Sequence, residues 1–411
     1  MSVKILYGES EITANEISSI KIIEEPDVLS TTLRSATVDV VLVTDSLEDI
    51  IEHKDDVFTI YYGENFAMKT AFLSYKQKSQ NVWSLEFENY IKILEKHNFH
   101  GDIYDGKPAH EVIYEIFESA GFSREEIIID ETLIDDSITL TGFIPYTNCK
   151  ESLMQVLFPI GAIATSENGM PCIVSVSSQN TTNIPNSRTL VGVKVEEQEE
   201  AEYEYIELTA YSYSKSHDTK IMFQEEYNMI VATEDNPQRL ELIFDEPCFD
   251  YNVVGALFAA GSTTFKYNII EQSANHIVLD WWFSGSGKYN VTITVYADNY
   301  KHTTSVFSND VEDSEDKRSK TIEDMTLVNS ENAETIIARC LEEYARTKSA
   351  VAKIVIGKHV SEDDVVTYDE DVKCGDIVTI PTDFQGEYNG RIVKEQYNLN
   401  NVIIIKEITV K

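Results

Sequence analysis

The sequence predicts a mainly β protein of several domains that carries an α+β insertion. The chain has 411 residues, more than the roughly 250–300 residues at which a single hydrophobic core stops growing. Alternating β-branched and aromatic residues recur through much of the chain, and this alternation is typical of half-buried strands. Helical spacing of apolar residues is confined to a few blocks. We therefore expect two to four domains, most of them built from strands.

Residues 36 to 93 carry the first group of predicted strands. The segments ATVDVVLVT (36–44) and DDVFTIYYG (55–63) alternate, and TAFLSYKQKSQNVWSLEFENY (70–90) has the pattern of a long hairpin. In its second arm Trp83, Leu85 and Phe87 share one face, because successive side chains of a strand point to opposite sides. We expect residues 1–93, together with 186–235, to form a first, discontinuous β-barrel.

An inserted α+β domain is predicted at residues 94–185. PAHEVIYEIFESAG (108–121) has helical spacing, and NCKESLMQVLFPIGAIATSENGMPCIVSVS (148–177) is the most clearly specified segment of the chain. Asn148 followed by Glu151 has the spacing of a capping box, and Gly161 suits the end of the helix. The residues after Gly161 have the pattern of a hairpin. This segment therefore predicts a packed unit of one helix and two strands, the αββ unit.

Two further units are predicted in the C-terminal half. Residues 236–320 form a β-rich domain that ends in an acidic connection, SNDVEDSEDKRSK (308–320). Residues 321–411 begin with a helix, whose apolar residues from Ala333 to Tyr344 keep helical spacing, and continue as a small C-terminal β-barrel. In this barrel GDIVTI (375–380) echoes DDVFTI (55–60). The match is either chance or the trace of two related barrels.

The five cysteines are predicted to be reduced and inert. They stand at positions 149, 172, 248, 340 and 374 without any CxxC pair, which argues against a disulfide framework and against a structural zinc site. Cys149 falls in the first turn of a predicted helix, where the helix dipole lowers a thiol pKa. The nearest histidines in sequence are His110 and His217, so the sequence offers Cys149 no local base, although folding could supply one. We interpret Cys149 as a small residue at a helix start.

The composition argues against binding to nucleic acids or membranes. With 71 acidic and 33 basic residues the formal net charge is −38, which repels nucleic-acid phosphates and anionic membrane surfaces. Sequence-specific nucleic-acid binding is therefore not expected. No run of about 18 apolar residues and no signal-peptide pattern occur, so we expect no membrane span and synthesis in the cytoplasm.

Motifs that support catalysis are incomplete. SGSGK (284–288) lacks the first Gly and the final Ser or Thr of a P-loop, and neither HExxH nor GxSxG occurs. Paired carboxylates of the glycosidase kind carry no weight in a chain with 71 acidic residues. We therefore expect no enzymatic activity, no catalytic residues, no cofactor and no metal site.

An acidic run lies near the middle of the chain and is the candidate functional surface. It contains Glu196, Glu197, Glu199, Glu200, Glu202 and Glu204. Two interpretations remain open, because the fold class alone does not separate them. The run is either a solvated strand face or the lining of an acidic channel.

Three segments in a fixed order are the most distinctive feature of the whole chain. They are DDVFTIYYG with its hairpin and FENYIKILEK (87–96), then GFIPYTNCKESLMQVLFPIGAIATSENG (142–169), then a helix followed by VKCGDIVTIPTDFQGEYNGRIVKEQYNL (372–399). Together they resemble the baseplate hub proteins of contractile phage tails and R-type bacteriocins. Lys150 and Ser152 depart from the pattern of that family. The residues that fit it are Ile144, Pro145, Cys149, Glu151, Leu153, Gly161, Ala162 and Gly169.

This resemblance implies a structural protein of a tail baseplate. Hubs of this family are homotrimers at the tip of the tail tube with two tube-like β-barrels per subunit, so that three subunits present six similar barrels to a sixfold tube. The implied partners are the tail tube protein, the central spike protein and other baseplate proteins, and the implied location is the phage or bacteriocin particle. An acidic channel wall suits such a conduit, because it repels translocating DNA.

Two other interpretations compete with the hub. A distal tail or tube-initiating protein would be a hexamer. A β-sandwich protein that binds glycans would use Trp281 and Trp282 as sugar platforms. Adjacent residues of a strand point to opposite faces, so at least one of these two tryptophans is expected inside.

Overall fold

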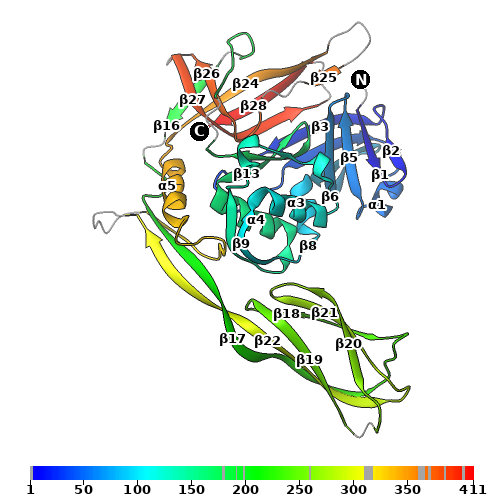
Figure 1. The fold of residues 1–411 in the computed structure, drawn as a ribbon. Helices are drawn as coiled ribbons and strands as arrows, with labels where there is room; N and C mark the ends of the chain where they lie inside the picture. Colours follow the sequence, from blue (N-terminus) through cyan, green and yellow to red (C-terminus); the bar gives the residue numbers. More distant parts are fainter. Residues whose placement is uncertain are drawn as a thin grey trace.

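Strands dominate the fold, as the sequence predicts. The computed structural model describes residues 3–177, 181–190, 192–197, 200–258, 261–309, 318–359, 366–368, 372–383, 386–399 and 403–411. Figure 1 shows a broad β region formed by the two ends of the chain, a helical region beneath it, and an arm of long strands that leads to a second β region.

The N-terminal β-unit occupies residues 3–88. Its strands bury alternate side chains; in β4, for example, Val38, Val40 and Leu42 are inside. The unit contains β1 (Val3–Tyr7), β2 (Ser10–Ile12), β3 (Ile17–Glu24), β4 (Thr37–Val43), α1 (Glu48–Glu52), β5 (Val57–Tyr62), β6 (Phe66–Ser79) and β7 (Val82–Glu88).

The C-terminal β-unit is assembled from two separate stretches of the chain. The first stretch supplies β15 (Thr181–Asn183) and β16 (Lys194–Glu197). The second supplies β24 (Lys348–His359), β25 (Val366–Tyr368), β26 (Ile377–Thr382), β27 (Gly386–Asn398) and β28 (Ile403–Val410).

The two β-units share one 14-stranded sheet. Its main path runs β16-β24-β28-β27-β3-β4-β7-β6-β5-β1-β2, so the units meet where β27 pairs with β3. One hydrophobic cluster extends through both units, from Val3 to Val410. The two predicted barrels are therefore joined parts of one structure, side by side in Figure 1.

The boundary expected for the first barrel differs from the structure. Residues 186–235 do not complete the N-terminal β-unit in the described part of the chain, because β16 pairs with β24 and the strand after it enters the arm. An alternating pattern identifies a strand but does not name its partner, since the ladder is made by backbone groups. Most of the expected acidic connection, residues 310–317, lies outside the described residues.

The inserted α+β domain follows β7 and ends near residue 177. Helices α3 and α4 pack against each other around a core that includes Ile113, Phe117 and Leu153. The elements are α2 (Tyr90–Glu95), β8 (Asn98–Phe99), β9 (Asp102–Pro108), α3 (Ala109–Ser119), η1 (Arg124–Glu126), β10 (Ile128–Ile129), η2 (Glu131–Leu133), β11 (Thr139–Ile144), β12 (Thr147–Asn148), α4 (Cys149–Ile160), β13 (Ala162–Glu167) and β14 (Met170–Ser175).

The arm consists of two long antiparallel strands, and its far half belongs to a β-sandwich. Near the β-units it packs against helix α5 (Ala333–Tyr344). One sheet of the sandwich has the order β19-β22-β17-β23 and the other β18-β21-β20. The strands are β17 (Tyr205–Ile230), β18 (Gln238–Ile243), β19 (Cys248–Phe258), β20 (Phe265–Gln272), β21 (His276–Phe283), β22 (Tyr289–Ser308) and β23 (Ser319–Ile322).

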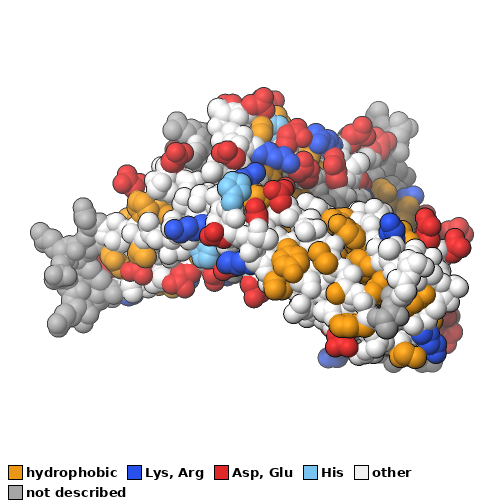
Figure 2. Space-filling view, turned by 60° about the horizontal axis from the view of Figure 1, so that its bottom comes forward, with side chains coloured by type: hydrophobic (Ala, Val, Ile, Leu, Met, Phe, Trp, Pro, Cys, Tyr) orange, Lys and Arg blue, Asp and Glu red, His pale blue; other side chains and the backbone are white. Residues whose placement is uncertain are grey.

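The surface of the sandwich exposes several large apolar side chains. Met229 is 63% exposed and Phe258 is 56% exposed, and Figure 2 shows hydrophobic patches at this end of the molecule, with acidic and basic side chains mixed elsewhere on that face. None of the helices in the described residues has the length and hydropathy needed to cross a membrane.

Candidate assembly surface

The two β-units repeat one strand arrangement. In the N-terminal unit β5, β6, β7, β4 and β3 pair in that order, and every pair is antiparallel. In the C-terminal unit β26, β27, β28, β24 and β16 pair in the same order and are also antiparallel. The two units are therefore topological repeats of each other.

The strand registers of the two repeats correspond as well. Thr59 of β5 and Thr379 of β26 occupy the same place, each followed by an inward-facing Ile. The next strand shifts its register between Phe72 and Ser74 in β6 and at the equivalent place in β27, between residues 392 and 394. The similar segments DDVFTI and GDIVTI thus lead into equivalent strands. This placement supports the interpretation that they mark two related β-units.

Each of the two strands that form the junction between the units has an equivalent strand in the other unit. In the described chain these equivalent strands have no partner at the corresponding position. β27 extends past β26 and pairs with β3, where Glu395 lies opposite Glu24 and Asn398 opposite Lys21. In the repeat, the far half of β6 corresponds to this part of β27, and β16 corresponds to β3. Within the described residues, no strand pairs with the outer side of either element. Among the described strands, each β-unit therefore has a free edge at the position that corresponds to this junction.

These two free edges are mostly exposed. We call residues 73–79 the β6 edge and residues 194–197 the β16 edge. Every residue of the β6 edge is exposed, and Leu73 and Tyr75 expose 45% and 48% of their surface. In the β16 edge Lys194, Glu196 and Glu197 are exposed. An exposed edge strand is a template for pairing with another chain, and its charged side chains restrict which chain it accepts.

The hairpin of the αββ unit connects both β-units. The backbone N–H of Ala67 in β6 donates to the carbonyl oxygen of Asn168 at 3.1 Å. The hairpin turns at Gly169, whose φ is +81°. On its other side the carboxylate of Glu167 lies 2.7 Å from Nζ of Lys373, just before β26. The inserted domain is therefore fastened to the N-terminal and C-terminal β-units at once.

Helix α4 begins and ends where the sequence predicts. The Asn148 side chain accepts a hydrogen bond from the backbone N–H of Glu151 at 2.9 Å, and Gly161 ends the helix with φ +70°. The Glu151 carboxylate bonds to the hydroxyl of Thr147. Cys149 is buried, and desolvation raises the pKa of its thiol to about 12. The thiolate is thus scarcely populated at neutral pH, which agrees with a packing role.

The predicted channel residues form an extended connection, not a single cluster. Glu196 and Glu197 lie in β16, while Glu200, Glu202 and Glu204 lie on the path to β17; Glu199 lies outside the described residues. Three of these carboxylates are close to cations, Glu197 at 3.6 Å from Lys348, Glu200 at 2.9 Å from Arg318 and Glu202 at 4.0 Å from Lys411. The negative charge of the run is therefore partly compensated.

The tryptophans considered as a sugar platform are not an exposed pair. Trp281 is 2% exposed and lies in the core of the sandwich, as expected for at least one of the two. Trp282 is half-buried and packs against the same cluster. The described β21 therefore offers no pair of free indole faces.

Comparison with known proteins gives a match in fold but not in sequence. No protein-family model matches the chain, and no curated protein matches it in sequence. The 43 kDa tail protein of prophage MuSo2 from Shewanella oneidensis is 10% identical, and the alignment covers 100% of this chain and 98% of that one with a TM-score of 0.50. The tail protein from Neisseria meningitidis MC58 is also 10% identical, with 100% and 96% covered and a TM-score of 0.50. Prophage tail protein gp18 from Listeria monocytogenes EGD-e gives 9% identity, 100% and 94% coverage and a TM-score of 0.48. The resemblance seen in the sequence is thus confirmed at the level of the fold, and over its whole length the chain has the fold of prophage tail proteins.

Proposed function

We propose that the chain is the hub of a tail baseplate, a ring of three copies that joins the tail tube to the central spike. The observation that carries this proposal is the junction of β27 with β3, which has an unpaired counterpart in each β-unit. Because the units repeat each other, the β6 edge of one chain can form the same junction with the β16 edge of the next. The fold shared with prophage tail proteins supports this setting.

The repeat also supplies a register for the contact between chains. Lys76 then faces Glu196; both are exposed and carry opposite charges, and such a pair across two strands contributes about 0.2–1 kcal/mol. Lys78 faces Lys194, which is a pair of like charges, so only the pair of Lys76 and Glu196 is favourable. The full set, transferred from the β27–β3 pairing, is Tyr75 opposite Glu197, Lys76 opposite Glu196, Gln77 opposite Val195 and Lys78 opposite Lys194.

A contact between two different edges leads to a closed ring when the rotation between neighbouring chains fits. Such heterologous contacts generate rings or open filaments, depending on that rotation. Three chains would contribute six β-units of one topology, which is the arrangement that the resemblance to tail hubs implies. The partners in this proposal are the tail tube protein, the central spike protein and other baseplate proteins, in a phage or bacteriocin particle. It includes no enzymatic activity and no cofactor.

Exchanging the charges across the two edges tests the proposal. Lys76→Glu and Glu196→Lys each place like charges opposite each other, so each is expected to lower the fraction of trimer at a given concentration. The double variant is expected to restore it, because the pair is opposite again. Light scattering over a concentration series measures the mass, which should reach three times the 46.6 kDa of one chain. Lys288→Glu, at an exposed lysine of the sandwich, is the matched control.

The other possible results discriminate between the competing interpretations. A hexamer would favour the distal tail or tube-initiating protein. A chain that stays monomeric at every concentration would contradict a ring formed by this chain alone. A trimer that both single variants leave unchanged would keep the number of copies but refute the pairing of the two edges.

A further inference from the structure

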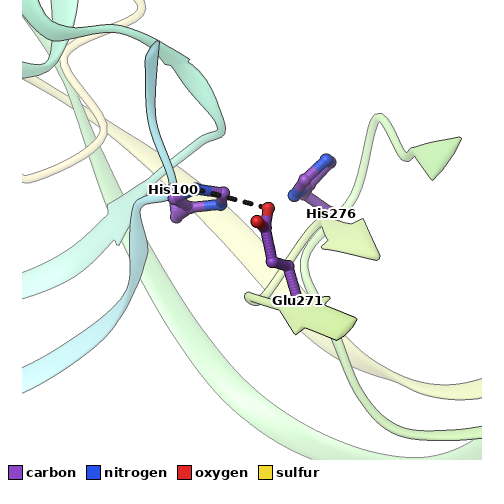
Figure 3. A group of neighbouring side chains, drawn as sticks. All are labelled: His100, Glu271 and His276. Carbon is purple, nitrogen blue, oxygen red and sulfur yellow. Dashed lines mark ion pairs between the residues drawn. The ribbon is translucent and has the colours of Figure 1, made fainter. Parts of the chain in front are cut away.

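Two histidines and a glutamate meet where the inserted domain touches the sandwich. Figure 3 shows His100 reaching from the connection between β8 and β9, and Glu271 and His276 reaching from β20 and β21, with the three side chains turned towards one another. One nitrogen or oxygen atom of each residue lies within 4.8 Å of the corresponding atoms of the other two. Donor atoms from two domains are therefore gathered at one point.

His276 is the fixed member of this group. Its side chain is 1% exposed, and its Nε2 lies 3.0 Å from Oε1 of Glu241. A carboxylate only accepts hydrogen bonds, so Nε2 carries a proton, and in the neutral form of the ring the lone pair is then on Nδ1. Nδ1 is buried and has no hydrogen-bond partner, although buried polar atoms normally have one. A histidine that gives one N–H to a carboxylate and keeps the other nitrogen free is oriented as metal-binding histidines are.

The other two residues of the group can adjust their positions. His100 and Glu271 are 48% and 51% exposed, and Nε2 of His100 lies 3.6 Å from Oε2 of Glu271. Zinc binds histidine nitrogen and carboxylate oxygen at about 2.0–2.2 Å, which puts tetrahedral ligand atoms about 3.4 Å apart. The pair from His100 and Glu271 is already close to that separation. Small rotations of these two exposed side chains bring their donor atoms towards Nδ1 of His276.

We propose that His100, Glu271 and His276 bind a divalent transition-metal ion such as Zn²⁺. Two imidazoles and one carboxylate are a donor set that zinc accepts, with water at the fourth position on the exposed side. Glu241 is a positioning residue, because it holds the ring of His276 without reaching the ion. This proposal departs from the sequence-based expectation of no metal site, and it does not depend on the proposed hub function.

The ion would lock the sandwich to the inserted domain. The ring of Tyr146 stacks on that of His276 at 3.9 Å, and the backbone N–H of Tyr146 donates to Oδ1 of Asn275 at 2.8 Å. These contacts fix one side of the joint, and the metal bridge adds His100 to it. The direction of the arm relative to the β-units would then be set by metal occupancy.

Calorimetric titration of the full-length chain, free of any affinity tag, with ZnCl₂ tests the site. The expected result is one ion per chain. His100→Gln and Glu271→Gln remove ligands from exposed positions, so they should leave the fold intact and weaken binding by more than about tenfold. His97→Gln, an exposed histidine three residues before His100, is the matched control and should bind as the wild type does. Absence of binding in the wild type, or equal binding in the ligand variants, would overturn the proposal.

Two further measurements separate this site from adventitious binding. Glu241→Ala keeps all three ligands but frees the ring of His276, so it should weaken zinc binding by about tenfold. Co²⁺ in place of Zn²⁺ should give absorption typical of nitrogen and oxygen ligands without a thiolate band, because all five cysteines are buried. A thiolate band in the Co²⁺ spectrum would mean that the ion binds elsewhere. The same conclusion would follow if the Glu241 variant and both ligand variants bound zinc as tightly as the wild type.

Discussion

Lys406 and Glu395 form a buried ion pair inside the C-terminal β-unit. Nζ of Lys406 lies 3.0 Å from Oε2 of Glu395, and the two side chains are 0% and 1% exposed. The same ammonium group donates to the carbonyl oxygen of Val372 at 3.0 Å. Moving two charges out of water is costly, and this cost is offset only when the charges remain paired and hydrogen-bonded. The pair lies on β27 and β28, next to the junction with β3.

Removing one member of this pair should destabilise the protein strongly. Lys406→Met leaves the Glu395 carboxylate buried without its cation, so the free energy of unfolding should fall by about 3–5 kcal/mol. Lys406→Met combined with Glu395→Leu should recover most of the loss, because an apolar pair of similar volume needs no partner. Guanidinium denaturation of the three proteins measures both effects. A single variant as stable as the wild type would show that the carboxylate reaches water.

At the scale of the residue, the sequence predicts what is local. Asn148 and Gly161 were identifiable because a helix cap depends on neighbours a few positions away. The metal-binding group was not predictable, because His100 and His276 come from different domains and no spacing rule links them. HNFH (97–100) shows a pair of histidines, but the partners of His100 are supplied by β20 and β21.

At the scale of the element, the β13–β14 hairpin contacts strand β6 through Gly169. A Cβ atom at Gly169 would lie 2.9 Å from backbone atoms of Ala67 and from Cβ of Met68. Gly121 has a similar φ of +83°, but a Cβ there would meet no atom within 4 Å. Replacing Gly121 therefore tests the effect of backbone conformation alone, whereas replacing Gly169 also tests the contact of the hairpin with β6.

Gly169→Ala should destabilise the protein more than Gly121→Ala. Both variants carry the penalty of about 1–2 kcal/mol for a left-handed residue with a side chain. Only the first also pushes the hairpin away from β6, which should cost at least about 1 kcal/mol more. Thermal denaturation measures the difference, and amide exchange at Ala67 shows whether its hydrogen bond opens. Equal destabilisation would mean that the hairpin tip does not need this close contact.

The elements that follow from the sequence are those with a continuous pattern. The hairpin of β6 and β7 and helix α5 lie where their alternating and helical spacing predicts. The length of β17 was not predicted, because its middle is exposed and no apolar pattern links the half that packs on α5 with the half in the sandwich. The partner of β16 was missed for a related reason, since a short charged edge strand resembles a loop.

At the scale of the whole molecule, net charge is the property that follows from the sequence without knowledge of the fold. Each chain carries a formal net charge of −38, and a ring of three would concentrate this charge around a central opening. The role of the acidic run as a channel lining stays a prediction. Its described members on the path to β17, Glu200, Glu202 and Glu204, are all exposed.

Reversing these three charges tests the channel prediction. Glu200→Lys, Glu202→Lys and Glu204→Lys together should leave the fold intact, because the side chains are exposed. Passage of DNA through assembled particles should decrease, since cations on the wall retain phosphates. Infectivity per particle measures this effect. The control reverses Glu48, Glu52 and Asp55 around helix α1, which are also exposed; an equal loss in both would point to total charge and not to position.

The sequence left open whether the chain contains two related β-units, and it gave no sign of the joined sheet. The echo between residues 55–60 and 375–380 is a local similarity that survives in equivalent strands. The junction forms where β27 extends past β26 and pairs with β3. This pairing is made by backbone hydrogen bonds between residues far apart in the sequence, so the pattern of side chains does not predict it. The agreement in fold with prophage tail proteins covers the whole chain at 10% identity, so the arrangement is maintained by few identical residues.

The divided origin of the C-terminal β-unit has a consequence for biosynthesis. β16 ends at residue 197, and its partner β24 begins only at residue 348. At translation rates of about 5–20 residues per second, β16 waits roughly 8–30 s for that partner to be synthesised. A nascent chain therefore displays the finished β6 edge while the β16 edge has not formed. In the proposed ring, where the β6 edge pairs with the β16 edge of the next chain, neighbouring chains on one messenger RNA would be unable to link during this interval, and only completed chains would close the ring.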